Sequence, residues 1–237
     1  MRRAAFTAAL ALPLLALAAL RWIDDRRNAL PPLFIAPAFE LTDQTGAVFS
    51  SDSLRGQVWI AAFTYTSCPD VCSLISARLA SLRDSLAAAG RLGEQVRLVS
   101  ISVDPERDTP PILAAYARSF GAADPAAWAF LTGDPDTVRR VVIEGFYLPI
   151  VGPEPIPNAT TVAGHRAEGA PADSVRRRGA PAEHTEPHGS GAAATDYLIS
   201  HSDRLLLVDG EGRVRGIYPA LDPNTPARLF SDLDRLL

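Results

Sequence analysis

Lysine is absent from this chain of 237 residues, and all 23 of its basic residues are arginine. The formal net charge is -4, which excludes the strongly basic surface expected of a protein that binds nucleic acid. Cysteine is scarce as well, and two residues are too few for a scaffold built on disulfides. Because only three residues separate Cys68 from Cys72, a local disulfide, a metal site and a redox pair all remain open.

The first 23 residues have the pattern of an export signal. Two arginines precede an uncharged apolar run over residues 4–20, which Arg21 closes. A run of about 17 residues is short for a bilayer span, so a cleaved signal peptide and a retained anchor both remain open. Trp22 favours the anchor, because tryptophan suits the membrane interface. We therefore expect a membrane-anchored domain on the periplasmic side of a bacterial membrane, in an oxidising compartment.

The rest of the chain divides into a linker and one domain with an insertion. Residues 24–38 are charged and then rich in proline, which is typical of a linker, and residues 39–237 carry the patterns of a domain. Within that domain, residues 152–195 are rich in alanine, glycine, proline and arginine without periodicity, which indicates a disordered insertion. The insertion contains three histidines, His165, His184 and His188. For His184 and His188, auxiliary capture of a metal ion and no specific role both remain open.

Strand and helix patterns alternate along the domain. Strands are expected at 39–49 (an N-terminal hairpin), 58–63, 96–103, 128–131 and 205–218 (a second hairpin). Helices are expected at 71–90, 109–120, 134–144 and from Thr225 onward, the last burying Leu229, Phe230, Leu233 and Leu236. This order predicts an α/β fold of the thioredoxin-like type, with a central mixed β-sheet flanked by helices.

The two cysteines lie where the apolar strand 58–63 gives way to a helical pattern. Their i, i+4 spacing places Cys68 and Cys72 on one face of the expected first helical turn. The helix dipole at that turn is expected to lower the thiol pKa values. Two adjacent thiolates select a soft metal, and Cu(I) is the best candidate in an exported protein. A structural disulfide or two inert buried thiols remain the alternatives.

A third metal ligand is expected from His201. This residue precedes the buried strand pattern 205–208, and in the expected fold that segment returns to the helix that follows Cys68. An imidazole also suits Cu(II), so two thiolates and one histidine suit both oxidation states of copper. A purely structural histidine remains the alternative.

Three ordered motifs carry a family resemblance. They are FTYTSCPDVC at 63–72, SVDPERDTP at 102–110, and His201-Ser202 ahead of Leu207-Val208-Asp209. Together they resemble the Sco/SenC family of thioredoxin-fold copper-binding proteins, which are usually membrane-anchored and assist assembly of the binuclear copper centre of cytochrome c oxidase. The resemblance implies one copper ion held by Cys68, Cys72 and His201, with Asp104 near the site. The long insertion before His201 departs from the family pattern.

Two functions of different classes follow from these residues. The first is a copper metallochaperone, not an enzyme, that passes metal to the copper-bearing subunit of cytochrome c oxidase or to another copper protein and depends on a thiol reductant. The second is an exported thiol–disulfide oxidoreductase, with Cys68 attacking and Cys72 resolving. The CxxxC spacing and the absence of proline at 199–202 favour copper. A peroxidase-type or redox-sensing role, and an Asp104 that only caps its loop, also remain open.

Overall fold

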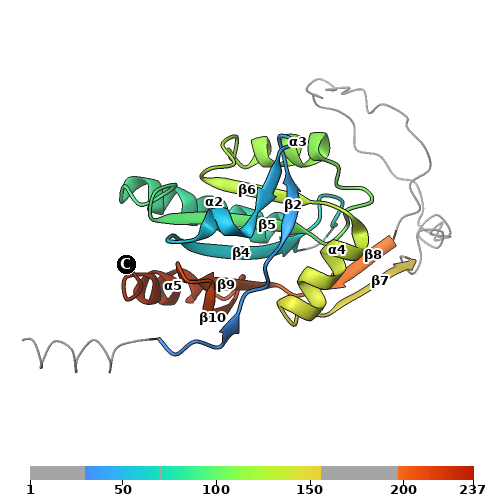
Figure 1. Ribbon diagram of the computed structural model, residues 1–237. Helices are drawn as coiled ribbons and strands as arrows, with labels where there is room; N and C mark the ends of the chain where they lie inside the picture. The colour runs from blue at the N-terminus through green and yellow to red at the C-terminus, as the bar shows by residue number, and fades with distance from the viewer. Residues whose placement is uncertain (1–29, 70, 156–196) are drawn as a thin grey trace, which may run out of the picture. The chain divides into compact units, whose positions relative to one another are not determined.

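An eight-stranded mixed sheet forms the centre of the fold in the computed structural model, which describes residues 30–69, 71–155 and 197–237 (Figure 1). The strand order is β1-β10-β9-β4-β5-β6-β2-β3. Its strands are β1 (Phe34–Ile35), β2 (Glu40–Asp43), β3 (Val48–Ser50), β4 (Val58–Thr64), β5 (Val96–Ser102), β6 (Trp128–Thr132), β9 (Arg204–Val208) and β10 (Arg213–Pro219). The helices are η1 (Ser51–Leu54), α2 (Cys72–Ala88), α3 (Pro110–Ser119), α4 (Pro135–Arg139), η2 (Arg140–Gly145) and α5 (Thr225–Leu233).

Three parallel strands, β4, β5 and β6, occupy the middle of the sheet. The register of β4 on β5 runs from Val58 opposite Val96 to Thr64 opposite Ser102. Every residue of β4 and β6 is buried, which explains why the sequence shows continuous apolar runs rather than alternation. Because parallel strands end at the same edge of the sheet, the loops after β4 and β5 lie next to each other. The other pairings, including β9 on β4, are antiparallel.

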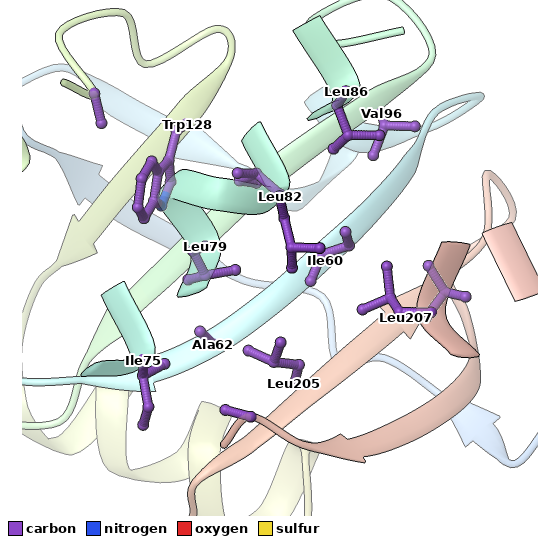
Figure 2. Close-up of a cluster of buried hydrophobic side chains, with 14 of the residues drawn as sticks. Ile60, Ala62, Ile75, Leu79, Leu82, Leu86, Val96, Trp128, Leu205 and Leu207 are labelled. Atoms are coloured by element: carbon purple, nitrogen blue, oxygen red, sulfur yellow. The ribbon is translucent and has the colours of Figure 1, made fainter. Parts of the chain in front are cut away.

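The two faces of the sheet are covered by different elements. On one face, α2, α3 and α5 join alternate residues of β4 in one buried cluster, and Figure 2 shows Leu79 and Leu82 of α2 among side chains of the sheet. On the other face, the ring of Phe146 makes edge contacts with Trp59 at 6.2 Å and Phe63 at 5.2 Å between ring centroids. Helices therefore flank both faces, as the sequence predicts for a sheet of buried parallel strands.

The expected helix boundaries are confirmed at three places. Thr109 is the N-cap of α3, with proline at the first helical position. Asp134 caps α4 by accepting a hydrogen bond from the Thr137 N–H at 2.9 Å. Gly90 follows α2 with a positive φ of 67°, the left-handed conformation that glycine adopts at a helix end. In α5, Leu229 and Leu233 are fully buried and Phe230 is only partly buried, and Leu236, also partly buried, lies beyond the end of the helix.

The sheet begins earlier than residue 39, so the expected linker 24–38 is partly wrong. Strand β1 pairs antiparallel with β10, with Phe34 opposite Val214. The ring of Phe34 also contacts that of Tyr147, at 5.3 Å between ring centroids. A strand of two residues is too short to show an alternating pattern, and its pairing partner lies far along the chain.

A separate two-stranded sheet pairs β7 (Ile150–Pro155) with β8 (Tyr197–His201). Residues 151–199 form their own structural unit, distinct from the rest of the chain. Strand β7 includes the first residues of the expected insertion 152–195, so that segment is not irregular throughout. The remainder of the insertion, with its three histidines, lies outside the described residues.

The expected membrane anchor, residues 1–23, lies outside the described residues. Within the described ranges, the longest helices fall short of the length and apolar character that crossing a bilayer requires.

Candidate metal centre

The cysteine turn (residues 65–71) joins the end of β4 to the start of α2. Cys68 lies in this turn and is half-buried, and its N–H donates a hydrogen bond to the Tyr65 carbonyl at 3.4 Å. Cys72 is the first residue of α2 and is 1% exposed. The spacing predicts that Cys68 lies in the first helical turn. In the structure, Cys68 instead lies before the helix begins. The structure still brings the two thiols into hydrogen-bonding contact.

Cys72 stays protonated near neutral pH. Its hydrogen bond with Cys68, followed by burial, raises the pKa of the Cys72 thiol far above its ordinary value. A backbone hydrogen bond with Tyr65 acts in the opposite direction and is outweighed. The expectation of a lowered pKa is therefore wrong for Cys72, because the hydrogen bond with Cys68 and the burial of the thiol both favour the protonated form.

A buried carboxylate ties the cysteine turn to the neighbouring loop. Asp108 is 0% exposed and precedes α3. Its Oδ1 accepts a hydrogen bond from the Thr66 hydroxyl at 2.5 Å, and its Oδ2 accepts one from the Thr66 N–H at 3.1 Å. The Ser102 hydroxyl at the end of β5 also donates to Oδ2, at 2.6 Å. Burial raises the pKa of Asp108, and these hydrogen bonds oppose the rise.

Asp104 lies in the same loop as Asp108. It is 2% exposed, and its N–H donates to the Ser102 hydroxyl at 3.0 Å. Its Oδ2 lies 4.0 Å from the Arg107 Nε, at the outer limit of an ion pair. The structure thus places Asp104 beside the carboxylate that holds the cysteine turn. Contact between Asp104 and a bound metal stays a prediction.

A second hydrogen-bonded pair stands behind Cys72. The Ser76 side chain, one helical turn after Cys72, is 0% exposed, and its hydroxyl lies 3.0 Å from that of Tyr116 on α3. Burial raises the pKa of Tyr116 to about 12, and both cysteines add to the rise electrostatically. This coupling places the Tyr116 hydroxyl within electrostatic reach of the thiol pair. Tyr116 is therefore neutral at neutral pH and adds no charge beside the sulfurs.

His201 is the last residue of β8, where the sequence predicts a turn. Its side chain lies outside the described part of the structure. Over residues 30–69, 71–155 and 197–237, as far as their side chains are described, no three cysteine, histidine, aspartate or glutamate side chains converge as a metal site. The structure therefore assembles the two expected sulfur ligands, and the third stays a prediction.

Two features of the site were missed at the level of sequence. Asp108 lies between the acidic loop and the helix start at Thr109-Pro110, so its sequence position indicates an ordinary loop residue. Its partner Thr66 lies in the turn motif 63–72. The pairing of Ser76 with Tyr116 joins positions 40 residues apart on different helices. The signal available in the sequence was the spacing of four residues, which places Ser76 on the same face of the helix as Cys72.

Chemically, the arrangement offers two sulfur donors of unequal access. Cys68 is reachable from solvent, whereas Cys72 is enclosed by the core. Such a pair binds a soft metal ion or closes into a disulfide. Hard cations such as Mg²⁺ and Ca²⁺ prefer oxygen ligands, so the sulfur pair does not suit them.

Known proteins share both the sequence and the fold. A Stutzerimonas stutzeri protein named for copper binding is 32% identical over 219 residues, which cover 91% of this chain and 86% of that protein. The SCO1 protein homolog of Bacillus subtilis is 32% identical over 117 residues, covering 49% of this chain and 58% of the relative. This second match thus spans little more than half the length of that relative.

Two solved structures give the same result. A SCO1/SenC family lipoprotein from Bacillus anthracis str. Ames superposes with a TM-score of 0.64 at 25% identity, over 88% of this chain and 99% of that one. ScoI of Bradyrhizobium japonicum, solved with copper bound, gives 0.59 at 27% identity, over 86% and 99%. The fold is thus the thioredoxin-like fold that the order of elements predicts. Since the SCO1/SenC family model also matches residues 28–166, the chain belongs to the SCO1/SenC family.

Proposed function

We propose that this protein is a copper metallochaperone that binds copper through Cys68, Cys72 and His201 and delivers it during assembly of the binuclear copper centre of cytochrome c oxidase. The observation that carries the proposal is the pair of thiols in hydrogen-bonding contact at the start of α2. A relative of the same fold was solved with copper bound, which supports the choice of metal. Copper is cargo here, taken up and released, rather than a resident cofactor.

The unequal access of the two thiols suits transfer. Cys72 is 1% exposed and sits on a helix fixed to the core, so it holds its position while cargo moves. Cys68 is half-buried in a turn, where an incoming thiolate of a partner reaches the same metal ion. Ligand exchange then proceeds by replacing Cys68 first and Cys72 last. The partner accordingly needs exposed soft ligands of its own.

Export supports the same function. Residues 1–23 would hold the domain at the extracytoplasmic face of the membrane, where copper enzymes of respiration are assembled. In that oxidising compartment Cys68 and Cys72 close into a disulfide unless a reductant acts on them, so a dedicated thiol reductant is part of the proposal. One relative of known structure is described as a lipoprotein, which supports a membrane-attached domain.

Copper affinity is expected to rise with pH. The pKa of Cys72 is raised, so near pH 7 its thiol carries a proton that the metal must displace. Each displaced proton strengthens binding by about tenfold per pH unit. Competition titrations with a Cu(I) chelator at pH 6, 7 and 8 measure how steeply copper affinity rises with pH. In Cys72→Ala one proton fewer is displaced, so the affinity is expected to rise about tenfold less per pH unit. An apparent affinity that does not change over this range contradicts thiolate ligation.

Replacing His201 with alanine tests the third ligand. We expect Cu(II) affinity to fall by about one to two orders of magnitude and the visible spectrum of the Cu(II) protein to change, since imidazole is the ligand that suits Cu(II). Cu(I) binding is expected to fall less, because the two sulfurs remain. Copper titration and absorption spectroscopy on the full chain measure both effects.

His188→Ala is the matched control, since it removes a histidine of the expected insertion and leaves the motif residues in place. It is expected to bind one copper ion as the wild type does. A His201→Ala variant with wild-type Cu(II) affinity and spectrum would remove the histidine from the model. A wild-type chain that binds no copper yet reduces a partner disulfide would replace the metallochaperone by the thiol–disulfide oxidoreductase.

A further inference from the structure

We propose that Asp108 is a positioning residue for the thiol pair: its buried carboxylate fixes the cysteine turn, and through it the placement of Cys68 relative to Cys72. The part concerning copper rests on the proposed function. The part concerning the thiols holds for the metal-free chain.

Three donors from two segments converge on this one carboxylate. Thr66, two residues before Cys68, donates both its N–H and its hydroxyl, and Ser102 donates its hydroxyl from the end of β5. Asp108 itself leads into α3. A single side chain therefore joins the turn after β4, the end of β5 and the start of α3.

An ordinary loop cap does not account for this geometry. Asp134 provides the comparison, since it caps α4 from an exposed position and accepts hydrogen bonds from Thr137, three residues ahead. Asp108 is 0% exposed, and its partner Thr66 lies 42 residues away on another loop. Burying a carboxylate costs free energy that a local cap does not incur, and only well-placed donors offset it.

The two cysteines depend on this carboxylate to different degrees. Cys72 begins a helix whose apolar face is packed on the sheet, so its position is set by the core. Cys68 lies in the turn, two residues after Thr66, whose hydroxyl and N–H both donate hydrogen bonds to Asp108. Releasing Thr66 therefore lets Cys68 move while Cys72 stays. Preorganised ligands bind more tightly because less freedom is lost on binding.

The first test compares Thr66→Val with Thr66→Ser. Valine keeps the shape of threonine and removes the hydroxyl that donates to Asp108, whereas serine keeps that donor. Asp108→Asn changes the acceptor of the same hydrogen bonds, because a neutral amide replaces the carboxylate. We expect Thr66→Val and Asp108→Asn to weaken Cu(I) binding at least about tenfold, as removal of an outer-shell partner does, and Thr66→Ser to stay near the wild type.

The second readout needs no metal. In glutathione redox buffers, Thr66→Val and Asp108→Asn are expected to shift the dithiol–disulfide equilibrium of Cys68 and Cys72 toward the disulfide by about tenfold, because a released Cys68 can adopt the geometry that a disulfide requires. Asp134→Ala, which removes the side-chain cap of α4, is expected to lower stability without shifting this equilibrium.

The outcomes separate the two proposals. If Thr66→Val and Asp108→Asn unfold earlier in urea but keep the wild-type dithiol–disulfide equilibrium, Asp108 is only a structural residue and the inference is overturned. If the wild-type chain binds no copper, the proposed function fails, while the redox equilibrium still decides the role of Asp108.

Discussion

Replacing Cys72 with alanine is expected to abolish tight copper binding, lowering Cu(I) affinity by more than about a hundredfold. That bound follows because changes in the groups around a metal site already cost about ten- to a hundredfold, and a lost ligand costs more. Alanine suits the first turn of α2 and leaves no buried hydroxyl, so the helix is expected to form normally. Chelator competition and copper counting after gel filtration measure the loss.

Ser76→Ala is the matched control for this variant. It removes one polar atom from a buried position on the same face of α2, one turn further along, and leaves both sulfurs in place. We expect wild-type copper stoichiometry from it, although Tyr116 loses its hydrogen-bond partner. Tight copper binding by Cys72→Ala would show that the thiol pair is not the site.

The largest expected loss of stability comes from Leu79→Ala. Leu79 is 0% exposed on α2 and faces Ile60 and Leu205 of the sheet in the cluster of Figure 2. Truncating a fully buried leucine removes its apolar contacts and leaves a cavity, which costs about 3 kcal/mol of unfolding free energy. Urea unfolding followed by tryptophan fluorescence measures the difference, and the buried Trp128 beside the cluster serves as the probe.

Leu74 on the same helix supplies the comparison. Its side chain is 56% exposed, so Leu74→Ala keeps the helix and removes little buried area. Its expected cost is below about 0.5 kcal/mol, the range of ordinary surface changes. Equal losses from the two variants would mean that α2 does not pack on the sheet through the face that bears Leu79.

Much of the fold was predictable because its signals are local. The buried strands β4, β5 and β6 are continuous apolar runs, and the helix starts at Pro110 and Pro135 follow from the fixed backbone of proline. The strand-to-helix position of the cysteine pair follows from the same two signals. Periodicity and turn chemistry act over a few residues, so a single sequence contains them.

The missed features depend on distant partners. Strand β1 exists only because β10 offers it a free edge, about 180 residues along the chain, and a two-residue strand has no periodicity of its own. Strand β7 likewise depends on β8 rather than on its own pattern. The pKa of Cys72 was predicted in the wrong direction because the sequence shows the helix start but not the burial of the thiol.

The pairing of β7 with β8 has a consequence for how freely this chain varies in length. These two strands close the segment of about 40 residues that lies between them. The free-energy cost of closing a loop grows only with the logarithm of its length. Halving or doubling this segment would therefore change the closure cost by only about 0.6 kcal/mol. Evolution can therefore lengthen or shorten the segment ahead of His201 at almost no thermodynamic penalty, while the strands on either side keep their register.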